Sequence, residues 1–262
     1  MGLLSSMNKE LPEEIIAPQQ SSFKFDIYYA EAWARRQGRF SFDLAHNVIR
    51  YLKSKQINVK SILDICSGSG EFISIMRNIC TDCVGVDNAD GYLNYVHTRY
   101  GDINFEKVEK LYSFDLKRKF NFISCNRDVV NMFVRWSEWE EFFKTVYKHL
   151  TKNGILMFDF YSEKKLKNWS ELTYEQGDGL DYVSNVFQNN GYCIMNETYY
   201  LKETSALTRK TGDIMVEAGF STEKIIDGLK VAGFNDVKVV DYELNPVSDY
   251  SLMDRIHILA TK

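Results

Sequence analysis

The chain predicts an α/β protein with a doubly wound, mostly parallel sheet, preceded by N-terminal helices and interrupted by an antiparallel β insertion. Three observations carry this prediction. A short apolar strand runs into a glycine-rich turn and then a helix between Lys60 and Phe72. Strand-like and helix-like segments then alternate as far as Phe160, which is typical of a parallel sheet with helices on both faces. The alternation breaks at residues 161–220 and returns at residues 221–262.

The regions before and after the insertion follow ordinary patterns. Residues 1–22 contain two of the three prolines and few periodic apolar positions, so we expect a mobile N-terminus. Residues 23–57 predict two helices, the first with an aromatic face and the second with an aliphatic stripe. Strands of the main sheet are expected at Cys83–Asp87, Phe120–Cys125, Val237–Val240 and Arg255–Ala260, besides the strand that precedes the glycine-rich turn.

The insertion predicts antiparallel strands. Two strand-like runs, Asp181–Gln188 and Tyr192–Tyr200, flank a turn of Asn189, Asn190 and Gly191, which is typical of a β-hairpin. A third strand is expected to include Asp213–Ala218. The predicted division of the chain is a mobile N-terminus at 1–22, a ligand-binding domain at 23–160 and 221–262, and the insertion at 161–220.

The glycine-rich turn predicts a nucleotide site. Gly68 and Gly70 have no Cβ, so the backbone can approach a ligand closely. The first N–H groups of the following helix lack intrahelical partners and point toward the ligand. The next strand ends at Asp87, whose carboxylate can accept two hydrogen bonds from a ribose diol. Both features belong at the carboxyl ends of the strands, where open α/β sheets bind their ligands.

The spacing of the turn separates two ligand classes. A dinucleotide fingerprint requires a third glycine where Ile73 stands, so a nicotinamide-dependent oxidoreductase is the least favoured reading. The run resembles motif I of the class I S-adenosylmethionine-dependent methyltransferases, written L-D-x-G-x-G-x-G. Cys66 replaces the first glycine of that motif, and the matching residues are Leu63, Asp64, Gly68 and Gly70.

The resemblance continues along the chain and is strongest to small-molecule methyltransferases of the amine or amino-sugar type. It implies a seven-stranded Rossmann-like sheet, S-adenosylmethionine as the cofactor and S-adenosylhomocysteine as its product. The segment that ends at Asp87 resembles motif II, whose acid holds the ribose hydroxyls. The other similar segments are Asn126–Met132, His149–Phe160 and Leu229–Phe234.

The resemblance also implies which residues contact the cofactor. Tyr28 or Tyr29 is expected to close over the sulfonium, and Arg39 to meet the cofactor carboxylate. Lys110 occupies the place of the family's adenine-side acid, which leaves the backbone N–H of Leu111 for that contact. The expected cofactor-binding set is Tyr28, Arg39, Asp64, Cys66, Ser67, Gly68, Gly70, Asp87, Asn88, Leu111, Cys125 and Asn126.

The expected reaction is an in-line displacement onto a nitrogen or an oxygen. Such a reaction mainly needs alignment and desolvation, and a hydroxyl acceptor also needs a base. Asp128, just after the strand that ends at Cys125, is the candidate catalytic residue that orients or deprotonates the acceptor. Its alternative role is to cap the following segment. The insertion is expected to cover the acceptor, with a surface ornament or a dimer contact as alternatives.

The amino-acid composition limits the classes of molecule that the protein is expected to bind. A net charge of −4 and the lack of a long basic cluster argue against a nucleic-acid acceptor. We expect no membrane span and no secretory signal. Five scattered cysteines favour reduced structural thiols and a cytoplasmic location over a metal site. We therefore expect a small-molecule acceptor and no metal, and a homodimer stays open. The alternatives are a methyltransferase acting on a protein or RNA and a non-catalytic cofactor-binding relative.

Overall fold

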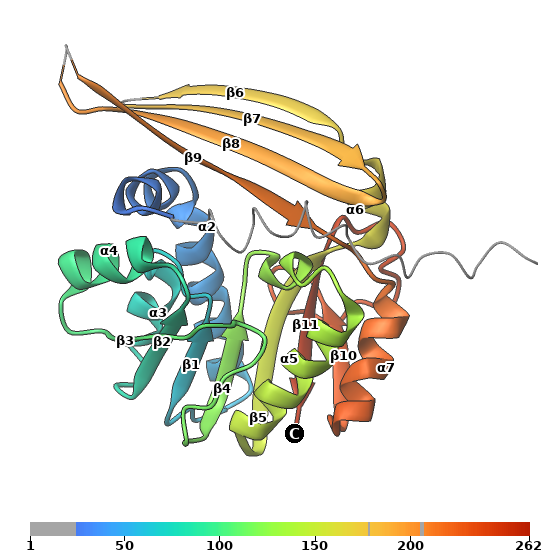
Figure 1. Cartoon of the computed structure of the whole chain (residues 1–262). Coiled ribbons are helices and arrows are strands. Elements are labelled where there is room, and N and C mark those ends of the chain that lie inside the picture. Colours follow the sequence, from blue (N-terminus) through green and yellow to red (C-terminus); the bar gives the residue numbers. More distant parts are fainter. Residues whose placement is uncertain (1–24, 178, 205–206) are drawn as a thin grey trace, which may run out of the picture.

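The computed structural model describes residues 25–177, 179–204 and 207–262, and the expectation for residues 1–22 lies outside them. A seven-stranded sheet forms the centre of the molecule (Figure 1). Its strand order is β10-β11-β5-β4-β1-β2-β3, and every strand except β11 runs in the same direction. These strands are β1 (Ile62–Ile65), β2 (Cys83–Asp87), β3 (Asn104–Lys107), β4 (Phe120–Cys125), β5 (Leu150–Tyr161), β10 (Asp236–Val240) and β11 (Arg255–Thr261).

Helices cover both faces of this sheet, so the predicted doubly wound fold is confirmed. Apolar side chains of α5 and α7 pack on one face, among them Trp139, Phe143 and Leu229. Side chains of α2, α3 and α4 pack on the other face. The helices are α2 (Ile27–Ser54), α3 (Glu71–Met76), α4 (Asp90–Tyr100), the short 3-10 helix η1 (Val129–Met132), α5 (Trp136–His149), α6 (Glu163–Asn168) and α7 (Thr222–Ala232).

The prediction of two helices within residues 23–57 is wrong, because α2 is one continuous helix. It begins after Asp26, whose carboxylate accepts a hydrogen bond from the Tyr29 N–H. The change from an aromatic to an aliphatic face does not mark a break. It marks two partners, since the first half of α2 packs Tyr29 against the second sheet and the second half packs Leu44 and Val48 against the main sheet.

A second, four-stranded antiparallel sheet lies over the carboxyl edge of the main sheet, and we call it the roof sheet (Figure 1). The expected hairpin and third strand are confirmed as its last three strands. The first strand, β6, escaped prediction because its side chains are mostly exposed, including Leu172 and Tyr174. The roof strands are β6 (Glu171–Gly177), β7 (Leu180–Asn189), β8 (Tyr192–Lys202) and β9 (Thr208–Glu217).

Among the described residues, no helix combines the length and apolar character needed to cross a bilayer.

Candidate active site

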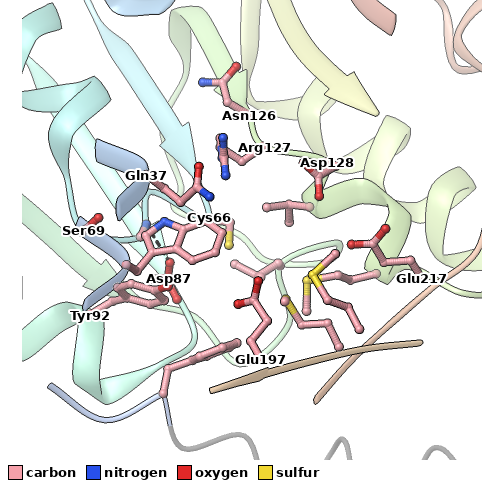
Figure 2. Close-up of a pocket in the computed structure, with 18 of the residues that line it drawn as sticks. Gln37, Cys66, Ser69, Asp87, Tyr92, Asn126, Arg127, Asp128, Glu197 and Glu217 are labelled. Carbon is pink, nitrogen blue, oxygen red and sulfur yellow. Dashed lines mark hydrogen bonds between the residues drawn. The ribbon is translucent and has the colours of Figure 1, made fainter. Parts of the chain in front are cut away.

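A cavity of about 940 Å³ lies between the carboxyl ends of the main strands and the roof sheet (Figure 2). The cavity lies above the end of β1, which pairs with β2 on one side and with β4 on the other. The strand order reverses at this position, and open α/β sheets bind their ligands at such switch points. The turn after β1, the end of β2, the residues after β4, the start of α2 and the inner face of the roof all contribute lining residues. The glycine turn and Asp87 are both part of this lining.

The turn after β1 holds three residues in the left-handed region. Cys66 has a φ of 52°, Gly68 of 55° and Gly70 of 82°. A Cβ on Gly70 would lie 3.0 Å from Val96 Cγ2 and 3.2 Å from the Tyr100 ring, so only glycine lets α4 pack this closely. Cys66 holds a left-handed backbone conformation that glycine adopts more readily, at the position where motif I has its first glycine.

Asp87 is fixed at the end of β2 by three backbone donors. Its Oδ1 accepts hydrogen bonds from the N–H groups of Asn88 and Ala89, and its Oδ2 accepts one from Gly68 at 3.0 Å. Burial raises the pKa of Asp87, while the three N–H groups oppose that shift. The carboxylate thus ties the glycine turn to β2 and faces the cavity, where the exposed Asn88 also contributes to the lining.

Asp64 forms a separate buried network under the turn. It accepts a hydrogen bond from Ser67 Oγ at 2.6 Å on one oxygen and from Ser124 Oγ at 2.7 Å on the other. Burial raises the pKa of Asp64 to about 7, against the effect of the two hydroxyls. Asp64 and Ser67 line the cavity, but they use these hydrogen bonds to join β1, the turn and β4.

The residues after β4 present polar groups without partners. Both side-chain amide atoms of Asn126 are buried and make no hydrogen bond with the described residues. Arg127 lies with its guanidinium carbon 5.1 Å from the centre of the Trp33 ring and 4.6 Å from that of Phe40. Leu111 contributes to the lining from the segment after β3. An unpaired buried amide is costly, which makes Asn126 a candidate contact for a bound ligand.

Four residues of the expected cofactor set do not line the cavity. Gly70 packs against Val96 and Tyr100 of α4. The Tyr28 ring packs under Arg209, Arg39 is exposed and pairs with Asp43, and Cys125 lies in the core of the main sheet. Adjacent residues of a helix face different directions, so Tyr28 and Tyr29 cannot both face the cavity. Tyr29 lines the cavity, together with Trp33, Arg36 and Gln37 from later turns of α2.

Glu197 on β8 joins α2 to the roof. Its buried carboxylate accepts hydrogen bonds from Tyr182 at 2.6 Å, Tyr29 at 3.0 Å and Tyr199 at 3.2 Å. We call this four-residue arrangement the tyrosine clasp. Burial, with the charge of Glu197 next, raises the pKa of all three tyrosines, so they stay neutral donors. Figure 2 shows Glu197 projecting into the cavity on the side of Asp87 and Cys66.

The sequence interpretation missed Glu197, although a signal was present. Side chains alternate between faces along a strand. The inward positions of β8 are Cys193, Met195, Glu197, Tyr199 and Leu201, so one acid interrupts an otherwise apolar or aromatic face.

Asp128 lines the cavity on the side of Glu217. Its carboxylate pairs with Arg255 at 2.5 Å, and Arg255 also pairs with Asp159 of β5. Asp128 precedes η1 without a side-chain capping bond, so the alternative capping role is not used. Burial raises the pKa of Asp128 although Arg255 lowers it. The carboxyl groups of Asp128 and Glu217 point toward one another in Figure 2.

A model of the methyltransferase domain family matches residues 24–202 of the chain. The chain belongs to this methyltransferase family. It is an S-adenosylmethionine-dependent enzyme, and the fold and cofactor implied by the resemblance are confirmed.

Solved structures of methyltransferases share the fold. An S-adenosylmethionine-dependent methyltransferase from Clostridium acetobutylicum superposes with a TM-score of 0.76 at 18% identity, over 89% of this chain and 97% of its own. CalS10, an amino pentose methyltransferase from Micromonospora echinaspora, gives 0.70 at 18% identity, over 90% and 97%. The sugar N-methyltransferase KedS8 from Streptoalloteichus gives 0.66 at 14% identity, over 100% and 96%. No curated protein sequence matches this methyltransferase.

The residues of the cavity fit the cofactor of this methyltransferase. The backbone at Gly68 is open, since a Cβ there would meet only the Tyr92 ring at 3.9 Å. Asp87 presents a fixed carboxylate, and the two amide atoms of Asn126 are unpaired among the described residues. An adenosyl ligand carries hydroxyl, amino and carboxylate groups that can satisfy these positions.

Proposed function

We propose that the enzyme transfers a methyl group to a nitrogen or oxygen of a small molecule held beneath the roof sheet. The observation that carries the proposal is a cavity of about 940 Å³ that is lined both by the glycine turn and by residues of β7, β8 and β9. That volume lies within the usual range for small-molecule sites. We call the part of the cavity beneath the roof sheet the chamber, and its residues include Met132, Met195, Met215, Glu217 and Trp169.

On this proposal, the turn and the end of β2 hold the cofactor. Asp87 accepts hydrogen bonds from the ribose hydroxyls, and the open backbone at Gly68 lies against the ligand. The Asn126 amide pairs with a polar group of the cofactor, and Leu111 packs near its adenine. When bound, S-adenosylmethionine supplies an electrophilic methyl group on a sulfonium that is already a good leaving group.

The chain's own contribution is to align the acceptor and to exclude water. The roof sheet and the first half of α2 close over the chamber through the tyrosine clasp, which removes solvent from the reacting groups. Asp128 orients the acceptor and takes its proton. Its pairing with Arg255 fixes the carboxylate at the chamber wall, so the acceptor meets a preset partner.

Two of the similar structures act on sugars: CalS10 is an amino pentose methyltransferase and KedS8 is a sugar N-methyltransferase. These two structures align with 90% and 100% of this chain, including residues of the roof sheet. The likeness supports a small-molecule acceptor. We propose that residues 161–220 serve as the cover of the acceptor site.

The test is a transfer assay with S-adenosylmethionine labelled on its methyl group. The full chain is incubated with a panel of amines, amino sugars and phenols, with protein mixtures and with total RNA in parallel. We expect label in the low-mass fraction. Label confined to precipitated protein or RNA would contradict the small-molecule assignment.

A further inference from the structure

We propose that the acceptor is a primary or secondary amine that enters as its ammonium form and is held by the carboxyl pair of Asp128 and Glu217. The inference rests on the proposed function and narrows it from nitrogen or oxygen to nitrogen. It also assigns a binding role to Glu217, which no motif of the sequence indicated.

Glu217 is a buried acid placed at the end of a roof strand. It is 2% exposed, and its Oε2 is buried without a hydrogen-bond donor among the described residues. Alternation along β9 places Glu217 on the same inward face as Met215, and Cys193 is its partner on β8. A buried carboxylate oxygen without a donor is costly, so the geometry favours a donor supplied by a ligand.

The charges around the pair leave a negative balance. Arg255 is shared between Asp128 and Asp159, and the charge of Arg127 also acts on Asp128, so two cations face the three carboxyl groups of Asp128, Asp159 and Glu217. Glu197 adds a further negative charge from β8. Burial, then the charge of Asp128, raises the pKa of Glu217, which suits a group that takes a proton from an ammonium. An alcohol would bring no positive charge to offset this balance.

Part of the remaining chamber wall is apolar. Met132, Val134, Met195 and Met215 line it, and methionine side chains adapt to the shape of a ligand. The chamber therefore suits an amino group carried on a carbon frame that is at least partly apolar.

The proton balance of the reaction is complete with these groups. The ammonium R–NH₃⁺ gives one proton to the carboxyl pair and becomes R–NH₂. The nitrogen lone pair then forms the new N–C bond as the C–S bond breaks. The bond electrons pass to sulfur, the neutral thioether product remains, and the methylated amine carries the positive charge.

Calorimetric titration of the full chain tests this inference in two stages. S-adenosylhomocysteine is titrated first, and the loaded enzyme is then titrated with two matched pairs, cyclohexylamine against cyclohexanol and benzylamine against benzyl alcohol. We expect each amine to bind about tenfold or more tightly than its alcohol, because a hydrogen bond to a charged partner is the stronger kind. Glu217→Gln should reduce the preference to about threefold or less.

The controls separate this inference from the proposed function. Glu203→Gln removes one charge from an exposed site of the roof sheet, where Glu203 pairs with Arg209, and should keep the amine preference. Retained S-adenosylhomocysteine binding shows that Glu217→Gln is folded. Equal binding of amines and alcohols, no amine binding at millimolar concentration, or a preference that survives Glu217→Gln overturns the inference alone. Absence of S-adenosylhomocysteine binding to the unmodified chain overturns the proposed function with it.

Discussion

At the residue scale, the two acids of the cofactor turn have different tasks. Asp64 shares its oxygens with Ser67 and Ser124 and braces the turn from below. Asp87 accepts three backbone N–H groups, interacts with the Cys66 thiol and faces the cavity. Both belong to the predicted motifs, yet their roles follow from the partners that surround them. Ser67, Asn88 and Ala89 are close to the acids in the sequence, whereas Ser124 and Gly68 are brought to them by the fold.

Asp64→Asn should change how stability depends on pH. The folded pKa of Asp64 is about 7, above the value for an unfolded chain. Its protonated form is therefore favoured on folding, and that contribution is present below about pH 4 and lost as the pH rises through 7. Between pH 5 and 8, the wild type should lose about 3 kcal/mol more free energy of unfolding than the variant does.

Urea unfolding at pH 5, 6, 7 and 8 measures the effect. Asp90→Asn, at an exposed position at the start of α4, is the matched control and should follow the wild-type profile. Parallel profiles for the wild type and Asp64→Asn would contradict the burial argument.

The cofactor turn and Asp87 were predictable because a short local pattern determines them. The rest of the site was not, because it depends on side-chain direction and on distant elements. Tyr29 lines the cavity, whereas the Tyr28 ring contacts Arg209, and this difference depends on how α2 packs against the roof. Glu197 and Glu217 line the cavity only because the roof sheet lies over the main sheet. No local sequence motif indicates that arrangement.

At the element scale, α2 is the helix that connects both sheets. Its second half buries Leu44 and Val48 in the main core, and its first half buries Tyr29 against Tyr199 of the roof. The ring centres of Tyr29 and Tyr199 lie 5.4 Å apart in an edge-to-face arrangement. The tyrosine clasp adds polar bonds to this contact, so α2 and the roof should move together.

Tyr29→Phe should weaken the attachment of α2 to the roof. The ring contacts remain, but one hydrogen bond to the buried Glu197 carboxylate is lost. We expect the free energy of unfolding to fall by about 1–3 kcal/mol. Affinity for S-adenosylhomocysteine should fall as well, since Tyr29 lines the cavity.

Chemical denaturation and calorimetry measure the two effects. Tyr28→Phe is the matched control, because Tyr28 contacts Arg209 through its ring, which phenylalanine keeps. An equal loss in both variants, or no loss in either, would contradict the role of the tyrosine clasp.

At the scale of the whole molecule, two sheets enclose one cavity. The main sheet was predictable almost strand by strand, because alternating strands and helices give a doubly wound sheet by a general rule. The roof was predictable in its hairpin, where Asn190 and Gly191 form the turn. Its first strand was not, since an exposed edge strand lacks an apolar pattern. On our proposal, the roof sheet over the carboxyl edge covers a small acceptor.

The most direct test is calorimetric titration of the full chain with S-adenosylmethionine and S-adenosylhomocysteine, with NADH in parallel. We expect both adenosyl ligands to bind and NADH not to bind. Asp87→Ala should weaken adenosyl binding by about a hundredfold, because two ribose hydrogen bonds to a charged group are lost. The control variant Asp90→Ala, three residues farther along the chain, should bind as the wild type does. Absence of binding by either adenosyl ligand, or undiminished binding by Asp87→Ala, would contradict the account.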